Sequence, residues 1–109
     1  MEISRGDLVV AAFPGDYDKP RPALVVQSDV FDTLHSLTVL PLTSDLYPAT
    51  LIRIDIEPSQ SNGLHRRSHV MVDKATTVLR AKIGQRIGSV DAETMNAVGA
   101  ALARFLDIG

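Results

Sequence analysis

The 109-residue chain contains no cysteine and no tryptophan. Without cysteine, neither a disulfide framework nor a cysteine-based zinc site is available to hold the fold. No apolar stretch approaches the roughly 18 residues of a membrane span, and the first residues lack the basic start and apolar run of a signal peptide. We therefore expect a cytoplasmic protein that makes no use of a membrane.

The chain has the length of one domain, and we assign residues 1–109 to it. Hydrophobic residues make up 45% of the sequence, which excludes a disordered chain. The net charge of −2 is not that of a typical nucleic-acid-binding protein, which needs clustered cations for phosphate contacts. Cations nevertheless cluster locally at Arg66 and Arg67, and at Lys19 and Arg21.

Short strand-like runs dominate most of the chain. The expected strands cover residues 8–13, 23–27, 37–42, 51–56, 69–72 and 76–79, with loops at 14–20 and 58–63 and a helical turn within 28–36. Pro41 inside its strand favours an edge position or a bulge. Strict alternation over residues 51–56 predicts that Arg53 and Asp55 face outward.

Towards the C-terminus, the spacing of the hydrophobic residues changes from a strand-like to a helical pattern. Asp91 is placed to cap a helix, and a single helical face gathers Met95, Val98, Leu102 and Phe105. Strands followed by one helix indicate a small α+β domain whose sheet coils into a partly open barrel.

Several familiar catalytic motifs are absent from the sequence. It has neither a glycine-rich phosphate loop nor a serine nucleophile elbow. The histidines, His35, His65 and His69, lack the paired spacing of a metal site on one helix, so we expect no metal site.

Two segments carry candidate anion-binding groups. Arg21 lies between two prolines, which stiffen its backbone and favour a positioned guanidinium that grips a phosphate; the alternative is a surface ion pair with Asp16 or Asp18. Thr43 and Ser44 end a buried strand, where their hydroxyls either donate to an anion or begin a turn.

A third segment, residues 63–74, holds the densest cations of the chain and one acid, Asp73. From the residues alone, Asp73 is either a functional acid or the partner in an ion pair or cap, with Lys74 close by. Histidine side chains in general suit proton transfer, so His65 and His69 are further candidates, although a surface histidine is the ordinary interpretation of each.

Together, these segments resemble the MazF/PemK toxins of type II toxin–antitoxin systems. The resemblance rests on Arg5-Gly6-Asp7 before the first strand, Arg21-Pro22 opening the second, Pro41-Leu42-Thr43-Ser44 ending the third, residues 63–73, and the helix after Asp91. It covers essentially the whole chain. It implies an α+β fold, namely a small SH3-like, CcdB-type partly open barrel of antiparallel strands with a C-terminal α-helix.

The resemblance also implies an activity. The chain would be an mRNA interferase, a sequence-specific endoribonuclease that cuts single-stranded RNA through its own 2′-hydroxyl, leaves a 2′,3′-cyclic phosphate, and inhibits translation. It would need no cofactor and no metal, act as a homodimer, and be neutralised by a cognate antitoxin protein.

Site residues follow from the same resemblance. Arg21 and Thr43 match catalytic positions of the family, and Asp73 matches an acid of the PemK branch. That branch has an arginine where this chain has Met71, and its first-loop histidine has no match here. Asp73 is the candidate general base, and His65 or His69 could serve instead. The expected RNA-binding residues are Tyr17, Lys19, Ser44, His65 and Arg66.

Two alternatives to a ribonuclease remain, and the first comes from a competing resemblance. Residues 25–33 are similar to CcdB, a DNA gyrase poison of the same fold, but CcdB-type chains lack the Arg21-Pro22 pair and carry a C-terminal tryptophan that is missing here. A non-catalytic binding module of this fold is the other alternative, because fold alone does not fix function.

Overall fold

The computed structural model describes residues 2–13, 19–46 and 51–109. These residues form the following strands and helix: β1 (Asp7–Ala12), β2 (Pro20–Val25), β3 (Ser36–Thr43), β4 (Arg53–Ile56), β5 (Ser68–Met71), β6 (Thr76–Leu79), β7 (Ile83–Ser89) and α1 (Ala92–Leu106). Three short 3₁₀ turns connect them: η1 (Asp29–Phe31), η2 (Val72–Lys74) and η3 (Arg80–Lys82).

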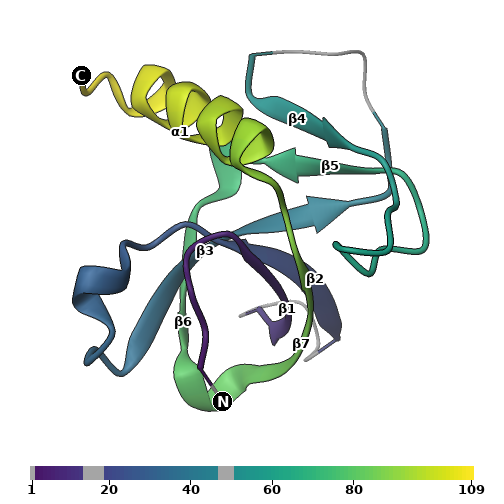
Figure 1. Cartoon of the computed structure of the whole chain (residues 1–109). Helices are drawn as coiled ribbons and strands as arrows, with labels where there is room; N and C mark the ends of the chain where they lie inside the picture. Colours follow the sequence, from purple (N-terminus) through teal and green to yellow (C-terminus); the bar gives the residue numbers. More distant parts are fainter. Residues whose placement is uncertain (1, 14–18, 47–50) are drawn as a thin grey trace.

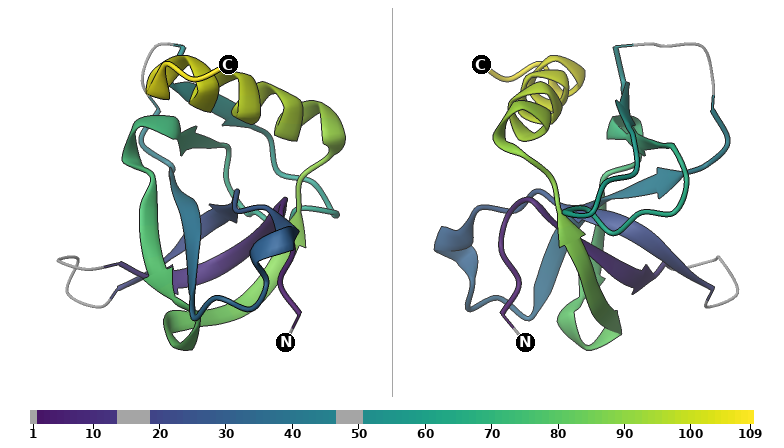
Figure 2. Two further views of the ribbon diagram at one scale, coloured as in Figure 1. Left: turned by 90° about the vertical axis from the view of Figure 1, so that its left-hand side faces the viewer. Right: turned by 45° about the vertical axis from the view of Figure 1, so that its right-hand side comes forward.

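The strands pair in antiparallel fashion in the order β4-β5-β3-β2-β1-β7, and β6 adds to β3. Within the described part of the chain, no pairing joins β4 to β7, so the barrel stays partly open. Helix α1 lies across one end of the strands (Figures 1 and 2). The predicted fold class, a partly open antiparallel barrel with one C-terminal helix, is confirmed.

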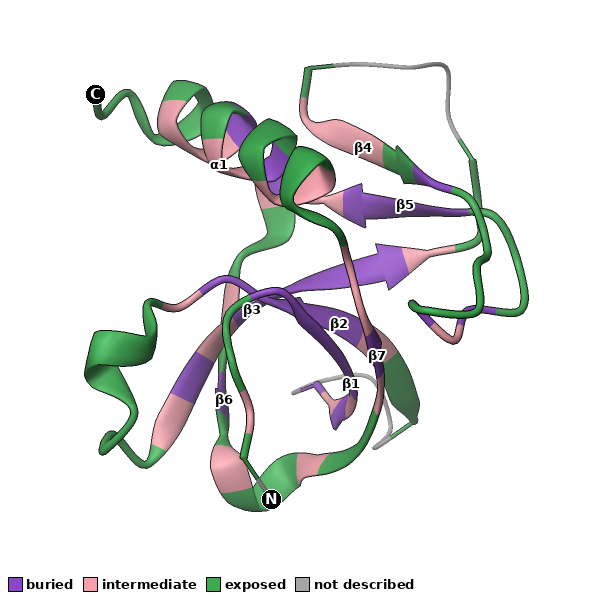
Figure 3. Ribbon diagram, viewed as in Figure 1, coloured by how far each residue is buried: buried purple, intermediate pink, exposed green. Residues whose placement is uncertain are grey.

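Two apolar clusters fill the two sides of the coiled sheet, because alternate residues of a strand point to opposite faces. One cluster lies beneath α1 and is built from Leu8, Leu24, Val26, Leu40, Leu42, Ile56, Leu64, Val70, Val72, Val98 and Ala101. The other lies among β1, β2, β3 and β6 and is built from Val9, Ala11, Phe13, Ala23, Val25, Leu37, Val39 and Val78. Buried residues cover most of β1 and β5 and the second half of β2 (Figure 3).

Helix α1 begins and packs largely as the sequence predicts. Asp91 caps it, with Oδ1 accepting a hydrogen bond of 2.8 Å from the backbone N–H of Thr94. Val98 is fully buried, and Met95 and Leu102 pack against the same cluster. Phe105 was expected on this face but is 47% exposed, because the last turn of the helix extends beyond the sheet. None of the helices in the described residues has the length and apolar character to cross a membrane.

Two local predictions were wrong, and both concern strands. Pro41 marks neither an edge strand nor a bulge: it pairs with Ala23 without a register shift, and β3 is central, with β2 along one side and, along the other, β6 up to Val39 and β5 from Leu42. Pro41 lies in the gap between these two partners, where a missing N–H costs no ladder bond. Arg53 does not face out; its side chain is only 13% exposed.

One strand, β7, has no counterpart among the predicted elements. Its sequence, Ile-Gly-Gln-Arg-Ile-Gly-Ser, lacks a clean alternation and contains two glycines, which are depleted in strands. Its place in the sheet comes from pairing with β1, a partner about 75 residues away, and so it depends on tertiary context.

Candidate active site

A cleft of about 600 Å³ opens where β2 begins, β3 ends and β7 passes beside them. Its apolar lining comes from Val10, Pro22, Leu42, Leu64 and Ile87. Its polar lining comes from Arg21, Thr43, Ser44, Asp45, His65, Arg66, Ser68 and Gln85, and Gly63 also lines it. The cleft therefore combines aliphatic side chains, which we call its apolar floor, with polar side chains, which we call its rim and which include two arginines and three hydroxyl residues.

The strand register explains why Arg21 and Thr43 meet in this cleft. In the β2–β3 pairing Ala23 lies opposite Pro41. Two residues further along each strand, Arg21 and Thr43 occupy matching positions, and side chains two residues apart on a strand share a face. The prolines on both sides of Arg21 fix its backbone, so the guanidinium projects from a stiff strand end.

The hydroxyl of Thr43 is oriented by the turn that follows it. Its Oγ1 accepts a hydrogen bond of 3.1 Å from the backbone N–H of Asp45. The hydroxyl hydrogen is consequently available for donation to an anion, and Ser44 stands beside it, exposed at the same rim. The turn and anion-donor interpretations of this segment are thus compatible.

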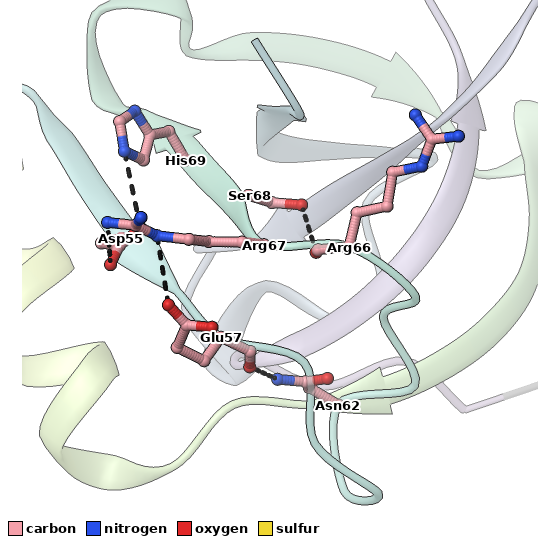
Figure 4. Close-up of polar contacts among 7 residues, drawn as sticks. All are labelled: Asp55, Glu57, Asn62, Arg66, Arg67, Ser68 and His69. Carbon is pink, nitrogen blue, oxygen red and sulfur yellow. Dashed lines mark hydrogen bonds and ion pairs between the residues drawn. The ribbon is translucent and has the colours of Figure 1, made fainter. Parts of the chain in front are cut away.

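One side of the cleft is a loop, residues 57–64, that is organised by the buried side chain of Asn62. Its Oδ1 accepts hydrogen bonds from the backbone N–H groups of Ser59, at 2.9 Å, and Leu64, at 3.0 Å, while its Nδ2 donates to the carbonyl of Glu57, at 2.9 Å. A buried amide with these partners locks the loop into one shape. The Asn62–Glu57 bond is drawn in Figure 4.

Close backbone packing holds this loop against β7. A Cβ on Gly63, which has φ +68°, would come within 2.1 Å of the carbonyl oxygen of Ile87. A Cβ on Gly88 would come within 2.4 Å of the backbone carbon of Asn62. Any larger residue at either position would force the loop and β7 apart, and the cleft between them would change shape.

Arg66 and Arg67 point in opposite directions from the start of β5 (Figure 4). Arg67 forms a two-pronged contact with Asp55, Nε to Oδ1 at 2.9 Å and Nη2 to Oδ2 at 3.1 Å, and its Nε lies 3.1 Å from Glu57 Oε1. The hydrogen bond from Arg67 holds the pKa of the Asp55 carboxyl below its usual range, and the same bond raises the pKa of Arg67. Arg66 forms no ion pair with the described residues and lines the cleft instead.

Asp73 lies outside this cleft, in η2. Its Oδ2 is 3.3 Å from Arg53 Nη2 and 3.8 Å from Lys74 Nζ, and its Oδ1 is buried without a hydrogen bond from the described residues. This geometry corresponds to the ion-pair alternative for the residue. The sequence pattern missed Arg53 as the partner, since Arg53 was expected to face outward.

The other predicted residues are divided between the cleft and its surroundings. Of the expected RNA-binding residues, Ser44, His65 and Arg66 line the cleft, Lys19 is exposed just before β2 without lining it, and Tyr17 lies outside the described residues. His69 is buried in β5, with Nε2 3.5 Å from Asp55 Oδ1. Within the described ranges, no group of three or more His, Asp or Glu residues is arranged to hold a metal ion.

Sequence reasoning did not single out Asp45, Gln85, Val10 or Ile87, whereas the other residues of the apolar floor lie within the motifs on which the resemblance rests. Asp45 is the one carboxylate among the described residues that line the cleft. It directly follows the Thr43-Ser44 pair, so its position was a usable signal. Gln85 belongs to the strand that the sequence pattern did not reveal, and nothing local pointed to it.

A small, partly open antiparallel barrel with one C-terminal helix and a cleft at adjacent strand ends defines the class of fold. Residues 4–106 match the family model described as PemK-like, MazF-like toxin of type II toxin–antitoxin system. The chain belongs to this family of toxins, and the sequence-based family assignment is confirmed.

Individual relatives agree with the family model. The chain is 44% identical over 107 residues, 97% of this chain and 98% of the relative, to the probable endoribonuclease MazF of Mycolicibacterium smegmatis. Its structure resembles the Mycobacterium tuberculosis toxin MazF-mt6, with a TM-score of 0.81 and 25% identity over 94% of this chain and 98% of that one. The fold also matches a mycobacterial endoribonuclease solved with its cognate antitoxin, with a TM-score of 0.83 and 21% identity over 99% and 98% of the two chains.

Proposed function

We propose that this toxin is a sequence-specific endoribonuclease that cuts single-stranded RNA, including mRNA, and thereby stops translation. The observation that carries the proposal is the cleft in which Arg21, Thr43 and Ser44 converge beside Arg66. Family membership and the 44% identical relative, a probable endoribonuclease, support the same reaction. A cleft of this size also has room for a nucleotide, since ligand pockets commonly enclose about 300–1,000 Å³.

In the proposed reaction the 2′-oxygen of one nucleotide attacks the adjacent phosphorus, and the bond from phosphorus to the 5′-oxygen of the next nucleotide breaks. The 2′-hydroxyl proton passes to a base, and the departing 5′-oxygen takes up a proton. The products are a 2′,3′-cyclic phosphate and a 5′-hydroxyl. The nucleophile belongs to the RNA, so the protein's task is to align it and to stabilise the added negative charge.

Arg21 is assigned the role of stabilising the negative charge on the phosphate oxygens. Its planar guanidinium binds two oxygens at once and stays protonated at physiological pH. Thr43 donates its hydroxyl hydrogen to the same phosphate, with its oxygen held by the Asp45 N–H. Ser44 and Arg66 contact the neighbouring backbone. The fixed strand ends keep these donors in place before the RNA arrives, which is how such groups contribute most to rate.

The proton acceptor that we favour is His65. It lines the cleft and makes no hydrogen bond with the described residues, whereas Asp73 lies outside the cleft beside Arg53, and His69 is buried beside Asp55. A histidine exchanges its proton near neutral pH and is the commonest general base. Asp73 is therefore proposed as a positioning residue that holds η2 through its pairing with Arg53.

The partners proposed for this chain are single-stranded RNA, a cognate antitoxin and a second copy of the chain. The neighbour solved with its antitoxin supports the second. The second copy of the chain is supported by exposed apolar side chains around η1 and β6. Since the substrate is mRNA, the proposed site of action is the cytoplasm.

The decisive experiment incubates purified protein with a long single-stranded RNA in EDTA, alongside Arg21→Ala. We expect defined cuts ending in a cyclic phosphate with the wild type and a loss of about 100-fold or more with Arg21→Ala, the scale seen when a positioned charge-stabilising donor is removed. Arg104→Ala, an exposed arginine on α1, serves as the matched control and should cut normally. Intact RNA with folded wild-type protein, or cleavage of DNA by gyrase in its presence, would refute the proposal.

A further inference from the structure

The pairing between β1 and β7 is interrupted at two points, and both concern the cleft. Leu8 pairs with Gly88 and Val9 pairs with Arg86, so Ile87 is an extra residue on β7. Val9 pairs with Arg86 and Ala11 with Ile83, so Gly84 and Gln85 lie opposite Val10 alone. These irregularities are β-bulges, which bend a strand and redirect its side chains, commonly next to binding sites.

The two bulges present Gln85 and Ile87, and these are the residues of β7 that line the cleft. Arg86, between them, points to the other side and places its Nε 3.1 Å from Asp7 Oδ1. Gly84 allows the backbone of β7 to lie close to β1 at the second bulge, because a Cβ there would lie 3.3 Å from the carbonyl oxygen of Val10. The strand is therefore shaped to bring one amide and one aliphatic side chain into the cleft.

The Gln85 side chain is exposed and makes no hydrogen bond with the described residues. It is neutral, so it adds little to phosphate binding, for which Arg21 and Arg66 already supply charge. A glutamine amide carries a donor and an acceptor side by side in one plane, the pattern that complements the edge of a nucleobase. Single-stranded RNA offers such edges on its unstacked bases.

The surroundings of Gln85 suit the face of that base. Ile87, Val10 and Pro22 lie on adjacent strands and form part of the apolar floor, with Leu64 from the loop opposite. A base laid on this floor buries its face against aliphatic groups, while its edge remains available to the amide.

We propose that Gln85 is a specificity-determining residue, which reads the edge of one nucleobase held on the floor formed by Val10, Pro22, Leu64 and Ile87. The inference rests on the proposed function, since it assumes that the cleft binds RNA. It adds that the sequence preference at one position of the RNA is set by β7 and not by the arginines.

The test measures base preference without relying on cleavage. Wild type, Gln85→Met and Gln85→Glu are each used to select bound sequences from a randomised 2′-fluoro RNA library, in which the attacking hydroxyl is absent. Gln85→Met keeps the length and neutrality of the side chain but removes both hydrogen-bonding groups. We expect the wild-type preference at one position to fall by about 5- to 100-fold, the range for a lost bidentate base contact, with other positions unchanged.

Gln60→Met is the matched control, because Gln60 is an exposed glutamine that does not line the cleft. Thermal unfolding verifies that each variant is folded, and Gln85→Glu, which keeps the shape but only accepts hydrogen bonds, should shift the preferred base even if Gln85→Met is unstable. The same preference at every position in wild type and both variants would overturn the inference, as would a wild type that selects no base. Cleavage of an all-ribose RNA by the same preparations tests the proposed function separately.

Discussion

In this protein, the surroundings of a side chain depend on the side of the strand end to which it points. Arg66 and Arg67 are adjacent in sequence and equally cationic, yet Arg67 is neutralised by Asp55 and Glu57 while Arg66 faces the cleft. The chain therefore offers a positive rim although its net charge is −2. A count of charges along the sequence does not reveal this division, because it depends on cross-strand partners.

At the residue scale, Asp73→Asn and His65→Gln should have opposite signatures. Asp73→Asn removes the charge beside Arg53 and should lower the free energy of unfolding by roughly 1.5–3 kcal/mol, the range for a hydrogen bond to a charged group, with a smaller effect on kcat. His65→Gln should leave stability unchanged and lower kcat by about 10²- to 10⁴-fold. Urea denaturation and single-turnover cleavage measure the two effects.

A second histidine separates the two roles further. His35→Gln, which alters an exposed histidine outside the cleft, should leave kcat unchanged. A full loss of kcat in a stable Asp73→Asn protein would assign the base to Asp73 instead.

The sequence indicated much of the site at this scale. Arg21, Thr43, Ser44, His65 and Arg66 all line one cleft. Their types and positions left alternatives open, and the resemblance to the toxin family selected them. Their catalytic and RNA-binding roles stay predictions. Gln85 and the Arg53–Asp73 pair were beyond reach, because each depends on which residues face each other across strands that are far apart in sequence.

At the scale of elements, α1 was the simplest to predict and β7 the hardest. A helix is signalled by its own cap and period, and Asp91 and Val98 supplied both. A strand with two glycines and two bulges carries no such local signal, and its pairing with β1 defines it.

The cap of α1 predicts a specific acid sensitivity. The hydrogen bonds from Thr94 hold the pKa of Asp91 below its usual range in the folded protein. A carboxyl whose pKa is lowered by folding stabilises the protein above its unfolded pKa of about 3.9, and the stabilisation is lost as the pH falls through the lower, folded value. Asp91→Ala should therefore be less stable than wild type at pH 7, and this difference should shrink in acid.

Urea denaturation between pH 7 and pH 2 measures this difference. Asp91→Asn is the control, because asparagine also caps helices but does not titrate. The difference in free energy of unfolding between Asp91→Asn and Asp91→Ala should stay constant with pH. A wild-type advantage over Asp91→Ala that is equally constant would show that the charge of the cap makes no contribution.

At the scale of the whole molecule, apolar side chains remain uncovered around η1 and β6. Val30 is 82% exposed, Phe31 53%, Leu34 49% and Leu79 56%. The segments are joined, since Arg80 N–H donates to the carbonyl of His35 at 2.8 Å and Ser36 pairs with Leu79. Apolar residues clustered on a small protein commonly mark a protein–protein contact.

We expect Val30→Asp with Phe31→Asp to convert a homodimer to a monomer in sedimentation equilibrium, because two charges would have to be buried in the contact. Phe105→Asp, at an exposed end of α1, is the matched control and should leave the mass unchanged. A wild type that is monomeric at all concentrations would show that no such dimer forms. A double variant that remains dimeric would place the contact elsewhere.

The pairing of β1 with β7 also has a consequence for how the cell makes this toxin. The cleft takes Val10 from one end of the chain and Ile87 from the other, so it cannot exist while the ribosome is still adding the residues between them. Such long-range pairing is also slow to form. With the cleft as the proposed site of cleavage, an incomplete nascent chain would leave the mRNA from which it is being read intact, and an antitoxin translated alongside it would have an interval in which to bind before the first cut.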